Sequence, residues 1–118
     1  IADAASEHGR LDFVRNFAGI LRGRVAHEVA EDDWRTVIET NLTGQLAPLR
    51  AAAVYWREAH EERGGFDRQR SPAVVPPVSG GARGSFGQAN YAAAKAGVLG
   101  LVWSVSPELA VSGAGLTS

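Results

Sequence analysis

Cysteine and methionine are both absent from the 118 residues. Without cysteine, the chain can form neither a disulfide nor a thiolate metal site. A chain that begins at Ile1 and contains no methionine is not an unprocessed translation product, so we expect it to be part of a longer protein. The histidines are far apart and show no metal-ligand spacing, so we expect no metal site; they are His8, His27 and His60.

An excess of charge of one sign and long apolar runs are also lacking. The formal net charge is −1, and the eleven arginines form no basic stripe, so nothing favours a nucleic-acid partner. No apolar run approaches the roughly 20 residues of a membrane-spanning helix. No basic segment followed by an apolar one opens the chain as in a secretory signal. We therefore expect a cytoplasmic protein with neither nucleic acid nor membrane as a partner.

The residues that are present suit one small globular domain, with 45% hydrophobic and 21% charged residues. Two short apolar runs, residues 11–14 and 73–75, predict buried strands. Pro76 and Pro77 end the second strand, because proline cannot donate a hydrogen bond to a central ladder. A helical pattern follows each run, so strand, helix, strand and helix succeed one another.

Three segments have helical features. Residues 1–8 have helical apolar spacing, and Gly9 is a natural helix stop. Acidic residues begin a long helix that we expect from about residue 32 to 60. The third helix, from about 88 to 104, is expected to kink or end near Pro107. The remaining segments predict a loop with a short helix at 20–30, a surface loop at 61–72, a glycine-rich loop at 79–87 and a small flexible tail at 112–118.

The stretch from Gly87 to Gly100 holds the residues with the most chemistry. Tyr91 and Lys95 are four residues apart, so a helix places them one turn apart on one face. Lys95 is the only lysine in the sequence. An ammonium group beside a phenol favours the phenolate, which suits Tyr91 as a general acid or base. By spacing alone, a surface helix on which the two residues happen to fall is the commoner explanation.

The longer phrase Gly-Gln-Ala-Asn-Tyr-Ala-Ala-Ala-Lys-Ala-Gly, with the glycine-rich run before it, resembles the active-site segment of the short-chain dehydrogenase/reductase family. The resemblance extends over residues 11–110 and implies an α/β fold, a partial Rossmann-type doubly wound parallel sheet of which only the second half is present. Residues 1–118 would then be a single partial domain whose N-terminal half is missing. The sequence around Tyr91 is most similar to those of bacterial 3-oxoacyl reductases and hydroxyacyl-CoA dehydrogenase domains.

The resemblance implies a hydride transfer between nicotinamide and a small-molecule carbonyl or alcohol, with an acyl thioester as one option for the substrate. Tyr91 would be the acid or base on the substrate oxygen. Lys95 would support Tyr91 and hold the nicotinamide ribose. Asn41 matches an Asn-x-x-Gly element that bends the long helix, and it would complete a proton relay. The alternatives for Asn41 are a solvated mid-helix residue and a glycosylation sequon, which we discount because nothing indicates secretion.

The cofactor implied by the resemblance is NAD or NADP. Asn16, Ala18 and Gly19 match the strand-end motif Asn-Asn-Ala-Gly, which shapes the floor of the cofactor site in the family. Tyr91 and Lys95 are also expected to contact the cofactor. The alternative for residues 16–19 is a plain strand-to-loop turn.

The sequence departs from the family pattern at several positions. Val78 stands thirteen residues before the tyrosine, where the family has its serine, and Ser79 follows one residue later. We therefore expect Ser79 to orient the substrate oxygen in its place. Phe17 replaces an asparagine, and Arg15 stands where an apolar residue is usual. No Gly-x-Gly-x-x-Gly turn is present to bind a pyrophosphate. We therefore expect the isolated chain of residues 1–118 to be inactive.

Two other functions remain open: an inactive remnant of the family that keeps an association surface, and an unrelated small α/β binding module. In the family, the two long helices pair across a dimer interface, so we expect a homo-oligomer through the helices around Leu46 and Leu101. Along the long helix, apolar residues recur at steps of four, three and four, the spacing of one face: Leu42, Leu46, Leu49 and Ala53. The candidate interface residues are Leu46, Leu49, Trp56, Val98, Leu101 and Val102.

Overall fold

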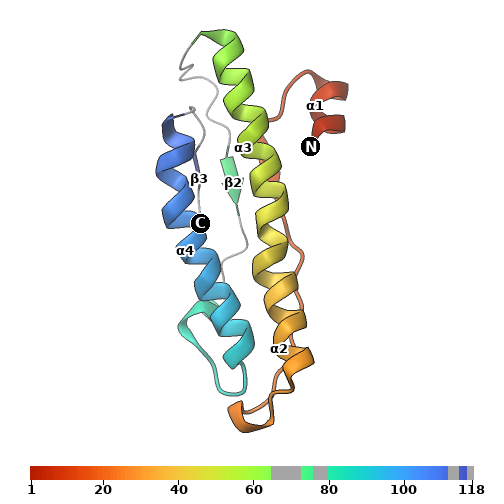
Figure 1. The fold of residues 1–118 in the computed structure, drawn as a ribbon, viewed down its shortest axis with the longest axis vertical. Helices are drawn as coiled ribbons and strands as arrows, with labels where there is room; N and C mark the ends of the chain where they lie inside the picture. The colour runs from red at the N-terminus through yellow and green to blue at the C-terminus, as the bar shows by residue number, and fades with distance from the viewer. Residues whose placement is uncertain (65–72, 76–79, 112–114, 117–118) are drawn as a thin grey trace.

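The computed structural model describes residues 1–64, 73–75, 80–111 and 115–116. The chain forms an elongated body of 54 × 25 × 16 Å, with two long helices running along its longest axis (Figure 1). In chain order the elements are α1 (Ala2–His8), β1 (Phe13–Arg15), the 3₁₀ turn η1 (Ala26–Glu28), α2 (Glu31–Ile38), the π-helical segment η2 (Glu39–Thr43), α3 (Gly44–Arg63), β2 (Ala73–Val75), the 3₁₀ turn η3 (Gly80–Arg83), α4 (Ala89–Val111) and β3 (Gly115–Leu116).

The three strands form one parallel sheet in the order β1-β2-β3. Val14 is paired with Val74, and Val74 with Leu116. Parallel neighbours need a long crossover, and here helices provide it on each occasion. The prediction of strands alternating with helices is therefore confirmed. A third strand is absent from the sequence prediction, which has only a tail at 112–118; main-chain pairing with β2 forms β3 from two residues that carry no strand pattern of their own.

The predicted strand at 11–14 corresponds to β1, which begins two residues later and ends one residue later. Its predicted burial is wrong: the Phe13 side chain is 53% exposed and Val14 is half-buried. The position of the strand explains this difference. β1 is at an edge of the described sheet, so one of its sides has no neighbouring strand among the described residues.

The predicted long helix is present as α2, η2 and α3 in unbroken succession, and it extends to Arg63 before Gly64 ends it in the left-handed conformation, with φ 72°. The expected interruption is η2, a π-helical turn. Of the predicted face, only Leu49 is buried, and Leu46 is 49% exposed. The buried residues of α3 are Gln45, Leu49, Ala52 and Trp56, so a polar residue replaces one of the expected apolar positions.

The core lies between α3 and α4. Trp56 is 4% exposed, and its indole Nε1 donates a hydrogen bond of 2.8 Å to the carbonyl of Leu11, which ties α3 to the start of β1. Four of the candidate interface residues, Leu49, Trp56, Val98 and Val102, are buried inside the chain, so they are not available as a surface. The buried cluster consists of Leu49, Ala52, Trp56, Val102 and Leu109.

The last helix, α4, continues through Pro107 to Val111, so of the expected kink or end near the proline the end is wrong. A helical proline leaves the carbonyl four residues earlier without its usual donor. That residue here is Trp103, whose side chain is 72% exposed, and Pro107 is exposed as well. The unpaired carbonyl therefore lies on the solvent side of the helix, where water satisfies it. Among the described residues, no helix has the length and apolarity needed to cross a membrane.

Candidate active site

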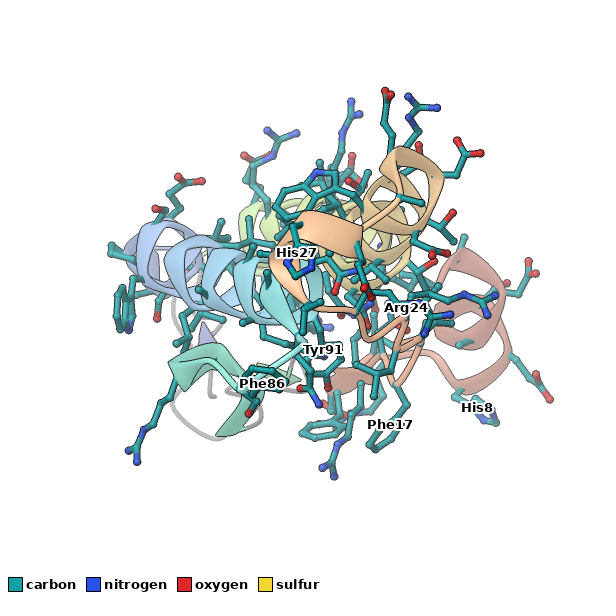
Figure 2. The ribbon with its side chains drawn as sticks, turned by 90° about the horizontal axis from the view of Figure 1, so that it is seen from below. His8, Phe17, Arg24, His27, Phe86 and Tyr91 are labelled. Carbon is teal, nitrogen blue, oxygen red and sulfur yellow. The ribbon has the colours of Figure 1, made fainter. Side chains whose placement is uncertain are left out.

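Residues 16–28 lie beside the start of α4 at one end of the molecule, the lower end in Figure 1. Figure 2 looks at this end and shows Tyr91 at the start of α4, with Arg24 and His27 from the loop after β1. The backbone joins these segments directly. The Arg24 N–H donates to the Gly87 carbonyl at 2.8 Å, and Arg24 forms an isolated parallel bridge with Gln88.

Tyr91 and Lys95 lie one turn apart on α4, as the spacing predicts. The Lys95 Nζ lies 5.5 Å from the centroid of the Tyr91 ring. Tyr91 is half-buried, whereas the Lys95 side chain is only 3% exposed. A lysine is almost never buried to this extent without a specific environment for its charge. The alternative of a surface helix with two solvated side chains is therefore wrong.

Asn41 lies in η2 and is fully buried, so it is not a solvated mid-helix residue. Its side-chain oxygen accepts from the Ile20 N–H at 3.1 Å, and its Nδ2 donates to the carbonyls of Ile20 at 2.8 Å and Val37 at 3.0 Å. Both N–H groups of the Asn41 amide are therefore used. Single π-turns inside α-helices are frequent at functional sites.

The loop after β1 is held against the long helix by side-chain amides. Asn16 donates to the Gly44 carbonyl at 3.0 Å, while its oxygen accepts from the Ala18 N–H at 3.0 Å. The buried Gln45 donates to the Ala18 carbonyl at 3.4 Å. Residues 16–20 thus form a loop that side-chain hydrogen bonds hold against the long helix, rather than a plain turn. Sequence reasoning missed Gln45, although its spacing of four from Asn41 places both on one helix face.

Gly19 is the position of closest approach in this loop. A Cβ atom added there would lie 2.9 Å from Oδ1 of Asn41, a separation that real Cβ atoms essentially never show. The backbone of Gly19 is not in a left-handed conformation, so the need for glycine comes from the neighbouring amide alone.

We expect Gly19→Ala to lower the free energy of unfolding by about 1–3 kcal/mol, because the added methyl group must push aside a buried, hydrogen-bonded amide. Urea unfolding followed by tryptophan fluorescence measures the change. Gly100→Ala is the matched control, since a Cβ at that helical position meets nothing within 4 Å. The control should stabilise the chain by roughly 0.5–1 kcal/mol. Equal effects of the two substitutions would contradict this account of Gly19.

The η2 segment also packs directly against the helix that carries the tyrosine. A Cβ atom added at Gly97 would lie 2.8 Å from Cδ2 of Leu42. The π-helical turn therefore packs on the helix that carries Tyr91 and Lys95. The absence of a side chain at Gly97 permits this approach, which brings the predicted elements of the site together.

Phe17 and Phe86 are among the exposed aromatic residues, at 68% and 92%. The Arg15 guanidinium stacks on the Phe17 ring, 4.5 Å from its centroid, so the two departures from the family motif contact each other. Figure 2 shows Phe17 after β1 and Phe86 in the turn before α4. The Ser79 position lies outside the described residues, as does Val78.

Asn90 is a further buried residue at this end for which the sequence prediction has no role. It is fully buried at the second position of α4, directly before Tyr91. Its Nδ2 donates to the Arg22 carbonyl at 3.1 Å, and its oxygen accepts from the Tyr91 N–H at 2.8 Å. Within the described part of the chain, no group of three or more histidine or acidic residues is placed to hold a metal ion.

Comparisons with known proteins agree with this arrangement. The sequence profile described as "short chain dehydrogenase" matches residues 1–116. The chain is 41% identical over 102 residues to the hydroxyacyl-CoA dehydrogenase ChsB1 of Mycobacterium tuberculosis, which covers 86% of this chain and 32% of that protein. It is 40% identical over 114 residues to the 3-oxoacyl-[acyl-carrier-protein] reductase FabG of Staphylococcus aureus, which covers 96% of this chain and 42% of that protein.

A solved structure of a short-chain dehydrogenase from Mycobacterium avium superposes with a TM-score of 0.84 at 34% identity, over 96% of this chain and 39% of the other. The chain therefore spans about a third to two fifths of the length of these relatives. The profile match covers nearly every residue, and the folds agree over the same range. The chain belongs to the short-chain dehydrogenase family.

Proposed function

We propose that this chain forms the catalytic part of an NAD(P)-dependent oxidoreductase that transfers hydride between a nicotinamide cofactor and a carbonyl or hydroxyl group. The observation that carries the proposal is the buried Lys95, whose ammonium group lies 5.5 Å from the centroid of the Tyr91 ring. Burial of a charged group is costly unless the charge has a partner, and the Tyr91 ring lies beside this charge.

Tyr91 would give a proton to the substrate oxygen during reduction and take it back during oxidation. The Lys95 ammonium, 5.5 Å from the centroid of the Tyr91 ring, would assist this proton transfer. Asn41 would complete the proton relay by holding, in the π-helical turn, a water that carries the proton to or from Lys95. Ser79 would orient the substrate oxygen in place of the family serine, whose position is occupied by Val78.

The donor groups in the site fit the ribose of a nicotinamide cofactor. Phenol and ammonium groups both donate hydrogen bonds, and ribose hydroxyls accept them. Lys95 and Tyr91 would hold the ribose. The loop at residues 16–20, with Asn16, Ala18 and Gly19, would border the nicotinamide. When bound, the cofactor supplies or accepts the hydride. The chain lacks a Gly-x-Gly-x-x-Gly turn, so we assign the pyrophosphate to the first half of a Rossmann-type sheet, of which residues 1–118 would be the second half.

The substrate class we favour is an acyl thioester. The relatives named above are a hydroxyacyl-CoA dehydrogenase and a 3-oxoacyl-[acyl-carrier-protein] reductase. The exposed Phe17 and Phe86 at the same end of the chain suit the apolar part of such a substrate. Association into a homo-oligomer would use the outward sides of α3 and α4 around Leu46, which is 49% exposed, and Leu101, which is half-buried.

A segment swap tests the proposal. In the swap enzyme, residues 1–118 replace the segment of the S. aureus reductase that they match. We expect the swap enzyme to oxidise NADH or NADPH in the presence of a 3-oxoacyl thioester. Its rate should exceed that of the same swap carrying Tyr91→Phe by about 10²–10⁴-fold, the usual contribution of a positioned acid or base. Absorbance of the reduced nicotinamide measures both rates.

The unmodified S. aureus reductase is the positive control, and circular dichroism checks that each swap folds. A folded swap enzyme that is no faster than its Tyr91→Phe variant would sink the proposal. That outcome would favour the alternative of an inactive family member that keeps only the fold and an association surface.

A further inference from the structure

The side chain of Asn90 uses both of its polar ends although it is fully buried. Its amide nitrogen donates to the Arg22 carbonyl at 3.1 Å, and its amide oxygen accepts from the Tyr91 N–H at 2.8 Å. The first of these partners is 68 residues away in sequence, and the second is the next residue. One side chain therefore links the start of α4 to the loop after β1.

The Tyr91 N–H needs such a partner because it lies in the first turn of its helix. The first four N–H groups of an α-helix have no acceptor within the helix. Here the first main-chain bond of α4 runs from the Ala92 N–H to the Gln88 carbonyl at 2.8 Å. The N–H of Tyr91 precedes it and is satisfied by the side chain of Asn90 instead. The Tyr91 N–H is thus held by the side chain of the preceding residue and not by a main-chain carbonyl.

The other partner, Arg22, lies in a segment that is fixed on both sides. Ile20 is held by both ends of the buried Asn41 amide, at 3.1 and 2.8 Å. Arg24 donates to Gly87, which is in the left-handed conformation with φ 71° in the turn before α4. Residues 20–24 therefore form a bridge between η2 and α4, and Asn90 is the side chain that joins this bridge to Tyr91.

We propose that Asn90 is a positioning residue that sets the placement of Tyr91 relative to η2 and the loop after β1. The inference rests on the proposed function, because it concerns the same acid or base. Only a side chain with a donor and an acceptor on one short stem satisfies both partners. Aspartate keeps the acceptor but sets a negative charge against the Arg22 carbonyl, serine keeps a short acceptor, and alanine has neither group.

In the swap enzyme, Asn90→Ala should lower kcat by about 10–100-fold, since small misplacements of a catalytic group have effects of this size. KM for the thioester should change less than about threefold, because Asn90 makes no contact with substrate in this proposal. Asn90→Ser should lose less of kcat than Asn90→Ala, because it retains an acceptor for the Tyr91 N–H. Hydrogen exchange, read by mass spectrometry, should accelerate in Asn90→Ala at the amides of Tyr91 and Arg24.

Val102→Ala is the matched control, since Val102 is buried in the same helix three turns beyond Tyr91. It should destabilise the fold yet leave kcat within about twofold, because it alters packing alone. A loss of kcat in Val102→Ala equal to that in Asn90→Ala, at similar melting temperatures, would overturn the proposal. So would a folded Asn90→Ala enzyme with unchanged kcat and unchanged exchange.

Amide hydrogen exchange tests the role of Asn90, whereas the rate of the swap enzyme tests the proposed function, so the two proposals can fail separately. A swap enzyme that is folded but inactive refutes the proposed function, while slow exchange at Tyr91 that is lost in Asn90→Ala still supports the link made by Asn90. If neither the alanine nor the serine variant folds, Asn90 serves the fold as a whole and the positioning role is refuted.

Discussion

Lys95→Ala should lower the kcat of the swap enzyme by about 10²–10⁴-fold, because it removes the cation that assists proton transfer by Tyr91. The loss should appear in kcat and not only in KM, since that transfer belongs to the chemical step. Lys95→Arg should restore little of the rate. A guanidinium group is wider and planar, and the buried site of Lys95, which is 3% exposed, accommodates a compact ammonium group.

Lys95→Met separates the charge of the lysine from its packing, since methionine keeps an unbranched stem of similar length without the ammonium group. We expect it to fold like the parent swap enzyme and to be as slow as Lys95→Ala. Steady-state kinetics and thermal melts of the three variants measure both effects. Near-normal rates in the alanine and arginine variants would show that Lys95 is a structural residue.

Tyr91→Phe should reduce kcat by a comparable factor, about 10²–10⁴-fold, while the fold and the packing of the ring are kept. Only the hydroxyl is removed, so cofactor affinity, measured by fluorescence titration, should change by less than about tenfold, the loss of one hydrogen bond.

The chain offers a matched control for this variant in Tyr55, its only other tyrosine, which is half-buried in α3. Tyr55→Phe should leave kcat unchanged within about twofold, because Tyr55 lies outside the proposed site. A Tyr91→Phe enzyme that keeps a third or more of the parent rate would assign the acid or base to another group.

Much of the site could be predicted because its strongest signals are local. The Tyr91–Lys95 pair needs only the periodicity of one helix, and the interruption at Asn41 needs only the poor helix formers that follow it. Both predictions are confirmed in position, although the catalytic roles stay predictions. Gly9 likewise ends α1 in the left-handed conformation, as a lone glycine after a helical pattern indicates.

The parts that sequence reasoning missed depend on distant partners. Gln45 and Asn90 read as ordinary polar residues, and only the folded chain shows that each is buried against a carbonyl from the loop after β1. The apolar spacing of the long helix includes Leu46, whereas the residue buried in the structure is Gln45. β3 was missed for the same reason: its pairing partner, β2, lies some forty residues earlier and its own two residues carry no strand pattern.

The π-helical turn places a length constraint on the chain. Buried residues follow one another at steps of four from Val37 through Asn41 and Gln45 to Leu49. In a plain α-helix each step of four overshoots a full turn by about 40°, and the wider turn of η2 absorbs that drift. Deleting one residue from η2 would rotate everything beyond it by about 100°. Either the Asn41 amide or the Trp56 core would then face solvent, so homologues that keep both ends of this helix should keep the number of residues between them.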